Sequence, residues 1–292
     1  MKQPDLLNIT TDAVHLPFFK EKDVLVDILR LDKIHPLVSG NKWFKLKYHI
    51  ENFYKGNYNG IITFGGAWSN HIVATACYCK LKNITAIGII RGERPVKFSS
   101  ALEKAEEYGI QLNFISREDY KRKNEPEFLK ILNDEYADYY IIPEGGAGPA
   151  GEKGAGEILN LLTKNDYSHI VCAIGTSTMY NGILKARNKD QVVIGIPVLR
   201  GMRKNEMKNS NRIITDYHFG GYAKYTSELI SFINDFYGHT TVPTDFVYTG
   251  KLCFAVADLI KKDFFPKGGK ILIIHSGGLQ GNNSLPPGML IF

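Results

Sequence analysis

Cysteine is scarce in this sequence of 292 residues, and the cysteines that are present follow no functional spacing. The four are Cys77, Cys79, Cys172 and Cys253, and no pair is spaced as CxxC. Three of them lie in apolar stretches, which favours free, buried thiols in a reducing compartment over a disulfide framework. The eight histidines show no metal-ligand spacing, so we predict no structural metal.

Long apolar runs are also missing. No run is long enough to span a bilayer, and residues 1–10 lack the basic-then-apolar pattern of a signal peptide. We therefore predict a cytoplasmic protein with no membrane partner. What is present is the composition of a globular enzyme, because 44% hydrophobic and 12% aromatic residues can bury a large core arranged in two lobes.

Dense runs of one charge are absent, although the formal net charge is +6. The basic clusters are short and fall in loops or at helix ends, at residues 121–123, 200–204 and 261–262. They form no single stripe and match no nucleic-acid module, so solvated faces explain them better than a nucleic-acid partner. A mild positive field favours anionic cofactors and amino-acid carboxylates instead.

Apolar segments of strand length alternate with helical patterns through most of the chain. The predicted strands are 24–31, 61–64, 85–90, 111–115, 138–142, 169–174, 192–197 and 270–274, and the predicted helices are 41–54, 72–82, 99–108, 127–135, 150–162, 180–187, 227–237 and 251–262. Such alternation predicts an α/β fold with open parallel sheets and helices on both faces. Glycine-rich 144–156 is the clearest seam between two domains. We predict a small α/β domain at 47–148 and a large one formed by 1–46 and 149–292.

The run Ser39-Gly40-Asn41-Lys42 places a lysine just after a glycine turn, at the opening of a predicted helix. The positive end of the helix dipole lowers the cost of losing the proton of that amine. Such a lysine can form a Schiff base with a carbonyl cofactor. Taken alone, the same triplet is also typical of an ordinary turn.

A second motif, Gly65-Gly66-Ala67-Trp68-Ser69-Asn70-His71, follows an apolar strand and precedes a helix. Its two glycines allow a ligand to approach the backbone closely, and the three residues after Trp68 present polar groups at a helix start. In isolation this pattern is also that of a common helix N-cap.

Three further strand ends carry polar residues. The strand at 169–174 runs into Gly175-Thr176-Ser177-Thr178-Met179, where a helix N-terminus and hydroxyl groups make an anion cradle or an ordinary cap. The other two are the cluster at 245–251, which contains Tyr248, and the turn at 275–278, which contains Ser276. Ligands bind at such strand ends in open α/β sheets, although a packed tyrosine and a simple turn explain the residues equally well.

Residues 146–151 also spell GxGxxG after a predicted strand, which raises the possibility of a dinucleotide enzyme. That mechanism needs an acidic residue at the end of the next strand, but this strand ends in Ile174-Gly175-Thr176. Pro149 also removes an N–H group that a pyrophosphate would use. The motif is therefore interpreted as a loop between the two lobes.

These clusters, in this order, resemble the 1-aminocyclopropane-1-carboxylate deaminase and D-cysteine desulfhydrase family of fold-type II pyridoxal-phosphate enzymes. The resemblance runs from about residue 16 to residue 281 and is most specific at 39–42, 65–66 with 69–71, and 247–251. It implies a tryptophan synthase β-like architecture of two open parallel-sheet α/β domains, of which the large one binds pyridoxal 5'-phosphate. It also implies a small amino-acid substrate and a homodimer.

The resemblance assigns roles residue by residue. Lys42 would bind the cofactor covalently and then move protons at the substrate carbons. The implied catalytic residues are Lys42, Ser69, Tyr222 and Tyr248; the implied cofactor-binding residues are Lys42, Lys45, Asn70, Thr176, Ser177, Thr178, Met179, Thr249 and Ser276; and the implied substrate-binding residues are Ser69, Asn70, His71, Tyr222 and Tyr248. The cofactor would act as the electron sink while the protein aims the bond to be broken.

Position 249 departs from the deaminases proper, which carry a glutamate beside the pyridine nitrogen. A carboxylate keeps that nitrogen protonated and strengthens the electron sink, whereas the hydroxyl of Thr249 tolerates a neutral nitrogen. Threonine resembles the desulfhydrase branch, so we expect β-elimination from a thiol amino acid such as D-cysteine, giving pyruvate, sulfide and ammonia. Deamination of 1-aminocyclopropane-1-carboxylate to 2-oxobutanoate and ammonia is the alternative.

Two further departures concern the phosphate turn and the substrate pocket. The family usually has glycine where Ser177 stands and threonine where Met179 stands, so the turn loses one side-chain hydroxyl. Trp68 is bulky and either narrows the substrate pocket or packs as a core or interface aromatic. The altered turn leaves a third alternative, a diverged, non-catalytic pyridoxal-phosphate-binding protein, against which the retained Lys42 argues.

Overall fold

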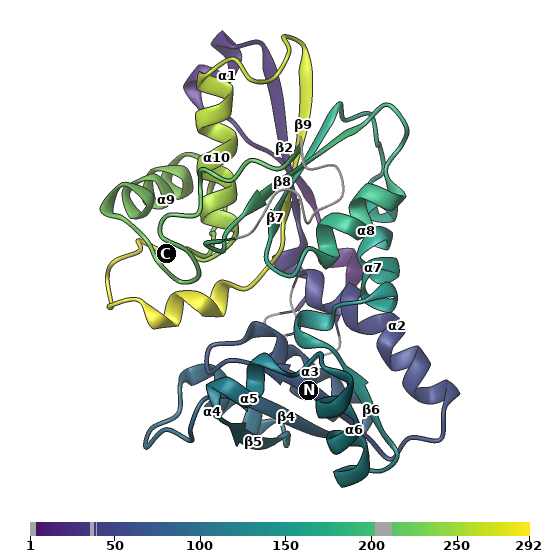
Figure 1. The fold of residues 1–292 in the computed structure, drawn as a ribbon. Coiled ribbons are helices and arrows are strands. Elements are labelled where there is room, and N and C mark those ends of the chain that lie inside the picture. The colour runs from purple at the N-terminus through teal and green to yellow at the C-terminus, as the bar shows by residue number, and fades with distance from the viewer. Residues whose placement is uncertain (1–3, 36–37, 39, 202–211) are drawn as a thin grey trace.

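The computed structural model describes residues 4–35, 38, 40–201 and 212–292. Ser39 of the lysine motif, and the part of the basic cluster at 200–204 that follows Gly201, lie outside the described residues. The described strands form two sheets (Figure 1). The larger has the order β1 (Thr11–Ala13), β2 (Val24–Arg30), β9 (Gly269–His275), β7 (His169–Ile174), β8 (Val192–Pro197), and the smaller has the order β5 (Gln111–Ile115), β4 (Thr85–Arg91), β3 (Gly60–Gly65), β6 (Tyr139–Ile142).

All neighbouring strand pairs are parallel except β1 with β2. The strands are apolar on both sides because both faces of each sheet are covered. In β7, for example, Val171 and Ala173 pack into one core cluster, whereas Ile170 and Cys172 pack into the cluster on the opposite face. The α/β fold with two open parallel sheets is thus confirmed.

The helices divide between the faces of the two sheets (Figure 1). One face of the larger sheet carries α1 (Pro17–Glu21), α9 (Ser227–Thr240) and α10 (Thr249–Lys261), and the other carries α7 (Pro149–Gly156), α8 (Thr178–Ala186) and the start of α2 (Asn41–Lys55). The smaller sheet has α3 (Asn70–Lys82), α4 (Ser100–Glu107) and the rest of α2 on one face, and α5 (Arg117–Lys121) and α6 (Pro126–Glu135) on the other.

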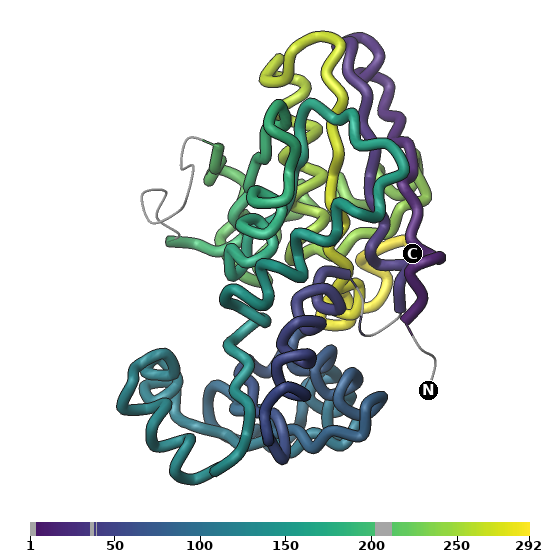
Figure 2. The backbone as a smooth tube through the Cα atoms, turned by 90° about the vertical axis from the view of Figure 1, so that its right-hand side faces the viewer, coloured from purple at the N-terminus to yellow at the C-terminus, as the bar shows by residue number. Residues whose placement is uncertain are grey.

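Helix α2 connects the two lobes. Its Phe44 packs in a core cluster of the larger sheet, and its Leu46 and Ile50 pack in a cluster of the smaller one. In the orthogonal view of Figure 2 the lobes stand apart and α2 runs from one to the other. The helix therefore carries residues of its first turns to the place where both lobes meet.

The GxGxxG segment is used for close helix packing. A Cβ on Gly151 would lie 1.8 Å from Gly146 O, and one on Gly154 would lie 1.9 Å from Phe44 O in α2. A Cβ on Gly182 of α8 would likewise lie 2.4 Å from Glu152 O. These glycines let α7 pack tightly between α2 and α8, which explains the motif without a dinucleotide.

Three helices begin two residues earlier than the sequence predicts. The predicted starts at 72, 180 and 251 compare with Asn70, Thr178 and Thr249. Hydrophobic periodicity marks only the apolar part of a helix, and each of these helices begins with a polar residue, Asn70, Thr178 or Thr249. The motif residues are therefore first-turn residues, whose N–H groups have no partner within the helix.

Strand β1 and helices α1 and α5 are absent from the prediction, because three to five residues are too few to show a period. The described strands of the smaller sheet fall within 60–142, inside the small domain predicted at 47–148, while the domain limits themselves stay a prediction. All four cysteines are buried and outside any disulfide, as predicted. In the described part of the chain, no helix is both long and apolar enough to cross a membrane.

Candidate functional site

A cavity of about 590 Å³ lies between the carboxyl ends of the two sheets. It is lined by turns that follow β9, β7 and β3 and by residues at or just after the ends of β4, β5 and β6. The carboxyl edge is where open α/β sheets bind ligands, since helix N-termini and loop N–H groups gather there. Of the predicted site residues, the lining includes Lys42, Lys45, Ser69, Asn70, His71, Thr176, Ser177, Met179, Tyr222, Tyr248 and Ser276, but not Thr178 or Thr249.

Lys42 is the second residue of α2, and a glycine is required just before this helix. Gly40 has φ 66°, and a Cβ there would lie 1.7 Å from Ser276 O. The N–H of Asn41 donates to the same carbonyl at 3.2 Å, which fixes the helix start to the turn after β9. Burial lowers the pKa of Lys42 to about 8, while the charge of Asp245 acts in the opposite direction. The expected loss of basicity is present, and its main cause is burial.

Lys45, one turn further along α2, has a buried amine whose hydrogen-bond partners are neutral. Its amine donates to Thr176 Oγ1 at 3.2 Å and to Gly145 O at 3.3 Å. Burial, reinforced by the charge of Lys42, holds the pKa of Lys45 well below its usual range. Among the described residues neither amine forms an ion pair with a carboxylate. A phosphate group would supply the missing negative charge, so the residues present fit this part of the cofactor.

The turn after β7 leads into α8 beside Lys45. Ser177 has φ 57°, a left-handed conformation that glycine adopts without strain. The hydroxyl of Thr178 is 3.0 Å from Thr176 Oγ1 and donates to Thr176 O at 3.2 Å, so it stabilises the turn itself. The sulfur of Met179 accepts a hydrogen bond from Asn41 Nδ2 at 3.3 Å. The glycine-to-serine departure therefore falls on the strained residue of the turn.

The turn after β3 presents its polar groups at the start of α3. Ser69 Oγ accepts from the Ile72 N–H at 3.3 Å, which leaves the proton of the hydroxyl for another acceptor. Thr63 Oγ1 donates to Ile142 O at 2.9 Å, so it accepts from Nε2 of His71, 2.8 Å away. This arrangement fixes the Nε2–H tautomer, and burial, with the charges of Lys42 and Lys45, keeps the pKa of His71 well below its usual range. His71 is therefore a neutral ring.

Two tyrosines and a tryptophan form the mouth of the cavity. The rings of Tyr222 and Tyr248 meet edge to face with centroids 6.3 Å apart. Burial raises the pKa of both hydroxyl groups, so each keeps its proton at neutral pH. Trp68 is 44% exposed and lines the cavity, and its carbonyl accepts from Tyr222 Oη at 3.4 Å. Trp68 is therefore a residue of the cavity wall and not of the core.

Ser276 lines the cavity in the turn after β9, whereas Thr249 is fully buried behind it. The Oγ1 of Thr249 is a buried polar atom without a hydrogen-bond partner among the described residues. Asp245 holds this part of the chain, because its carboxylate accepts the backbone N–H groups of Val247, Tyr248 and Thr249 at 2.7–3.0 Å. Of these two residues, Ser276 is therefore the one that lines the cavity.

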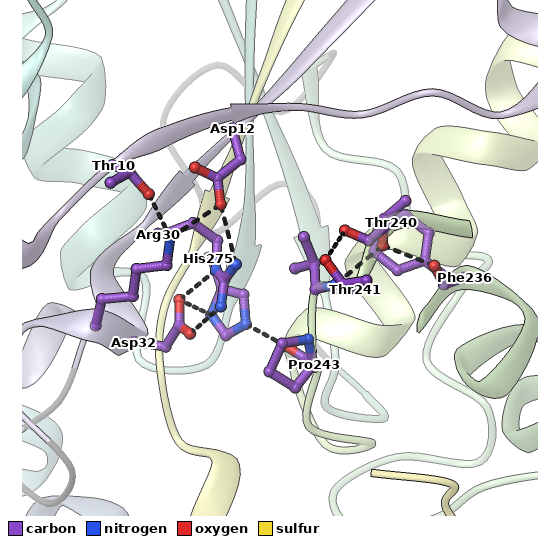
Figure 3. Close-up of polar contacts among 11 residues, drawn as sticks. Thr10, Asp12, Arg30, Asp32, Phe236, Thr240, Thr241, Pro243 and His275 are labelled. Atoms are coloured by element: carbon purple, nitrogen blue, oxygen red, sulfur yellow. Dashed lines mark hydrogen bonds and ion pairs between the residues drawn. The ribbon is translucent and has the colours of Figure 1, made fainter. Parts of the chain in front are cut away.

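A polar network joins His275, the residue before Ser276, to Asp32, Arg30 and Pro243 (Figure 3). His275 Nε2–H donates to Pro243 O at 2.8 Å, and its Nδ1 accepts the N–H of Gly277 at 3.1 Å. Asp32, 3.5 Å from His275 Nδ1, is paired with Arg30 at 2.6 Å. Since these groups are buried and mutually satisfied, the network fixes the direction of the turn.

Sequence reasoning missed three charged residues of the lining, namely Arg91, Arg117 and Glu144. Each stands at or directly after the end of a strand of the smaller sheet: β4 ends at Arg91, α5 begins at Arg117, and the 3₁₀ turn after β6 begins at Glu144. The signal was available, because each residue follows a predicted strand by one or two positions.

Comparison with known proteins agrees with this geometry, although no family model matches the chain. The chain is 30% identical, over 93% of its length and 90% of the other's, to a Pyrococcus abyssi protein whose name places it among the 1-aminocyclopropane-1-carboxylate deaminases. It is also 30% identical, over 84% of its length and 70% of the other's, to the mitochondrial bifunctional D-cysteine desulfhydrase/1-aminocyclopropane-1-carboxylate deaminase of Arabidopsis thaliana.

Among solved structures, a homologue of 1-aminocyclopropane-1-carboxylate deaminase superposes with a TM-score of 0.79 at 27% identity, covering 96% of this chain and 94% of that one. The order of the motifs, the two-sheet fold and the cavity between the carboxyl edges agree with these similarities. The chain belongs to the 1-aminocyclopropane-1-carboxylate deaminase and D-cysteine desulfhydrase family of fold-type II pyridoxal-phosphate-dependent enzymes.

Proposed function

We propose that the protein is a pyridoxal-phosphate-dependent lyase that eliminates the thiol group of D-cysteine or a related small amino acid. With one water consumed, the products are pyruvate, sulfide and ammonia. The observation that carries the proposal is the absence of a carboxylate at position 249, where this chain has a buried threonine. The neighbouring residue that lines the cavity, Ser276, also carries a hydroxyl and not a carboxylate. A hydroxyl does not keep the pyridine nitrogen protonated, which suits an elimination with a good leaving group better than the opening of a cyclopropane ring.

Pyridoxal phosphate, when bound, supplies an electron sink for the bond that is broken at the substrate α-carbon. Lys45, the turn at Thr176 and the N-terminus of α8 would hold its phosphate, and Lys42 would hold its aldehyde carbon. Asn70 would donate to the ring oxygen and Ser276 would face the ring nitrogen. Two observations support these roles. The amine of Lys45 is buried and, among the described residues, forms no ion pair with a carboxylate, and the residues Lys42, Lys45, Asn70 and Ser276 all line the cavity.

The remaining residues would bind the substrate and move its protons. The N–H groups and hydroxyl at the start of α3 would bind the substrate carboxylate, as helix N-termini bind anions. With a pKa of about 8, the Lys42 amine is partly unprotonated at neutral pH and can take the α-proton. Tyr222 and Tyr248 keep their protons at this pH, so either one can protonate the sulfur as it leaves. Ser69 is the third candidate acid, since its proton is not used by the cap.

Parallel assays of keto acid and sulfide test the proposal. The purified holoenzyme is incubated with D-cysteine, L-cysteine and 1-aminocyclopropane-1-carboxylate, with Lys42→Ala as the control. Pyruvate with equimolar sulfide from D-cysteine, absent in the variant, is the expected result. Release of 2-oxobutanoate from the cyclopropane amino acid would instead show that position 249 does not decide the reaction.

A further inference from the structure

Two arginines stand side by side on the cavity edge of the smaller sheet. Arg91 is the last residue of β4, and Arg117 is the first residue of α5, two residues after the end of β5. Strands β4 and β5 are neighbours, with Arg91 paired in register with Ile115. Both arginines line the cavity and both are exposed to solvent. Their guanidinium groups are therefore accessible from within the site.

Neither charge is matched by a carboxylate in the part of the chain that the structure describes. Among the described residues, no carboxylate lies within ion-pair distance of Arg91 or Arg117. The guanidinium carbon of Arg91 is 5.9 Å from the centroid of the Tyr120 ring, which supports it without neutralising it. The acidic residue on the same edge, Glu144, already has Lys123 Nζ 3.4 Å from its Oε2. The pair thus presents donors that a ligand anion can use.

The strand order places this pair beside the turn that would bind the substrate. Along the edge the sequence of strands is β5, β4, β3, so Arg117, Arg91 and the turn after β3 follow one another. A Cβ on Gly66 of that turn would lie 3.6 Å from Arg91 Nη2. An amino acid with its α-carboxylate at Ser69 and Asn70 can therefore extend its side chain along the edge towards both arginines.

We propose that Arg91 and Arg117 form a second anion site, and that the physiological substrate is a small amino acid whose side chain ends in an anionic group. Guanidinium groups bind carboxylate, sulfonate and phosphate oxygens through paired hydrogen bonds, and partial exposure lets them adapt to the ligand. Cysteine would fill only the inner part of this site. The inference rests on the proposed function for the position of the α-carboxylate.

Binding of matched amino acids to the holoenzyme tests the inference without turnover. Calorimetry compares aspartate with asparagine, and 3-phosphonoalanine with asparagine, each as the D and the L form, because none of these amino acids carries a leaving group on the β-carbon. Within each pair the two members share a backbone and differ in the charge of the side-chain end. We expect the anionic member to bind at least about 10-fold more tightly, the size of one charge-assisted hydrogen bond. The larger ratio of anionic to neutral affinity then shows whether the site prefers a carboxylate or a phosphate-like group.

The variants Arg91→Gln and Arg117→Gln should each lower that ratio by about 10-fold. Arg122→Gln is the matched control, because Arg122 is a partly exposed arginine of the same segment that pairs with Glu125 at 3.1 Å and does not line the cavity. Glu144→Gln should raise the ratio, since it removes a negative charge from the same edge.

Two results would overturn the inference. In the first, neither anionic amino acid binds more tightly than its neutral partner. In the second, Arg91→Gln weakens both members of a pair by the same factor, which would assign the arginine to the α-carboxylate. The keto-acid assay is independent of these ratios, so failure of the proposed elimination would be seen separately from failure of the second anion site.

Discussion

Burial lowers the pKa of the Lys42 amine to about 8, compared with about 10.5 for an ordinary lysine. At pH 7 an amine of pKa about 8 is unprotonated in roughly 9% of molecules, and one of pKa 10.5 in roughly 0.03%, a difference of about 300-fold. This free amine is the form that reacts with an aldehyde or accepts the substrate proton. The rate at which Lys42 reacts should therefore rise with pH around a midpoint near 8.

Reductive methylation measures this midpoint directly. Protein freed of bound aldehyde is treated with formaldehyde and cyanoborohydride between about pH 6 and pH 11, and mass spectrometry quantifies the peptide that contains Lys42. The same peptide, synthesised and unstructured, gives the reference curve. Asp245→Asn removes the charge that opposes the shift, so the midpoint should fall further in this variant. A Lys42 midpoint equal to that of the free peptide would refute the reasoning.

Three further predictions concern single residues around the site. Ser177→Gly removes the strain of a left-handed φ of 57° and should raise the free energy of unfolding by about 1 kcal/mol. The melting temperature should then be about 2 °C higher. A lower melting temperature would show that Ser177 is not strained. Lys45→Met removes the buried donor and should weaken the binding of pyridoxal phosphate, measured by calorimetry, by about 10- to 100-fold. The ligand-free variant should be more stable than the ligand-free wild type, because a buried amine is replaced by an apolar side chain. Unaltered affinity would show that Lys45 does not bind the phosphate. Lys251 donates to His218 O and Gly221 O, and burial lowers its pKa to about 8. Above this pH the unfolded chain therefore binds more protons than the folded one, and the free energy of unfolding should rise with pH from about 8 to 10. Urea denaturation at several pH values should show a smaller rise in Lys251→Met.

The elements that carry the site were largely predictable because their signals are local. The strand at 169–174 and the helix from 41 show their period and their glycine breaks within a dozen residues, and the structure has them as β7 and α2. The order of the motifs indicated a protein family, and that resemblance assigned Lys42, Ser69 and Tyr222 to one active site. The cavity brings all three together.

Side-chain environment was not predictable in the same way. The role of Thr249 beside the cofactor stays a prediction, but the sequence did not show that Thr249 is fully buried while Ser276 lines the cavity. For Trp68 the sequence left open a core position, which its 44% exposure and its place on the cavity wall exclude. Exposure depends on what distant segments cover, and a local pattern contains no record of that.

The sequence by itself determined the alternation of strands and helices, the glycine turns and the polar residues at strand ends, because each depends on the backbone preferences of neighbouring residues. The tertiary structure alone decided the strand order, and with it the position of Arg91 and Arg117 next to each other on one edge of the smaller sheet. It also decided the low pKa of Lys42. Burial lowers this pKa, and the charge of Asp245, about two hundred positions further along the chain, partly opposes the shift. Desolvation and charge act through space, so they arise only when the fold brings such residues together.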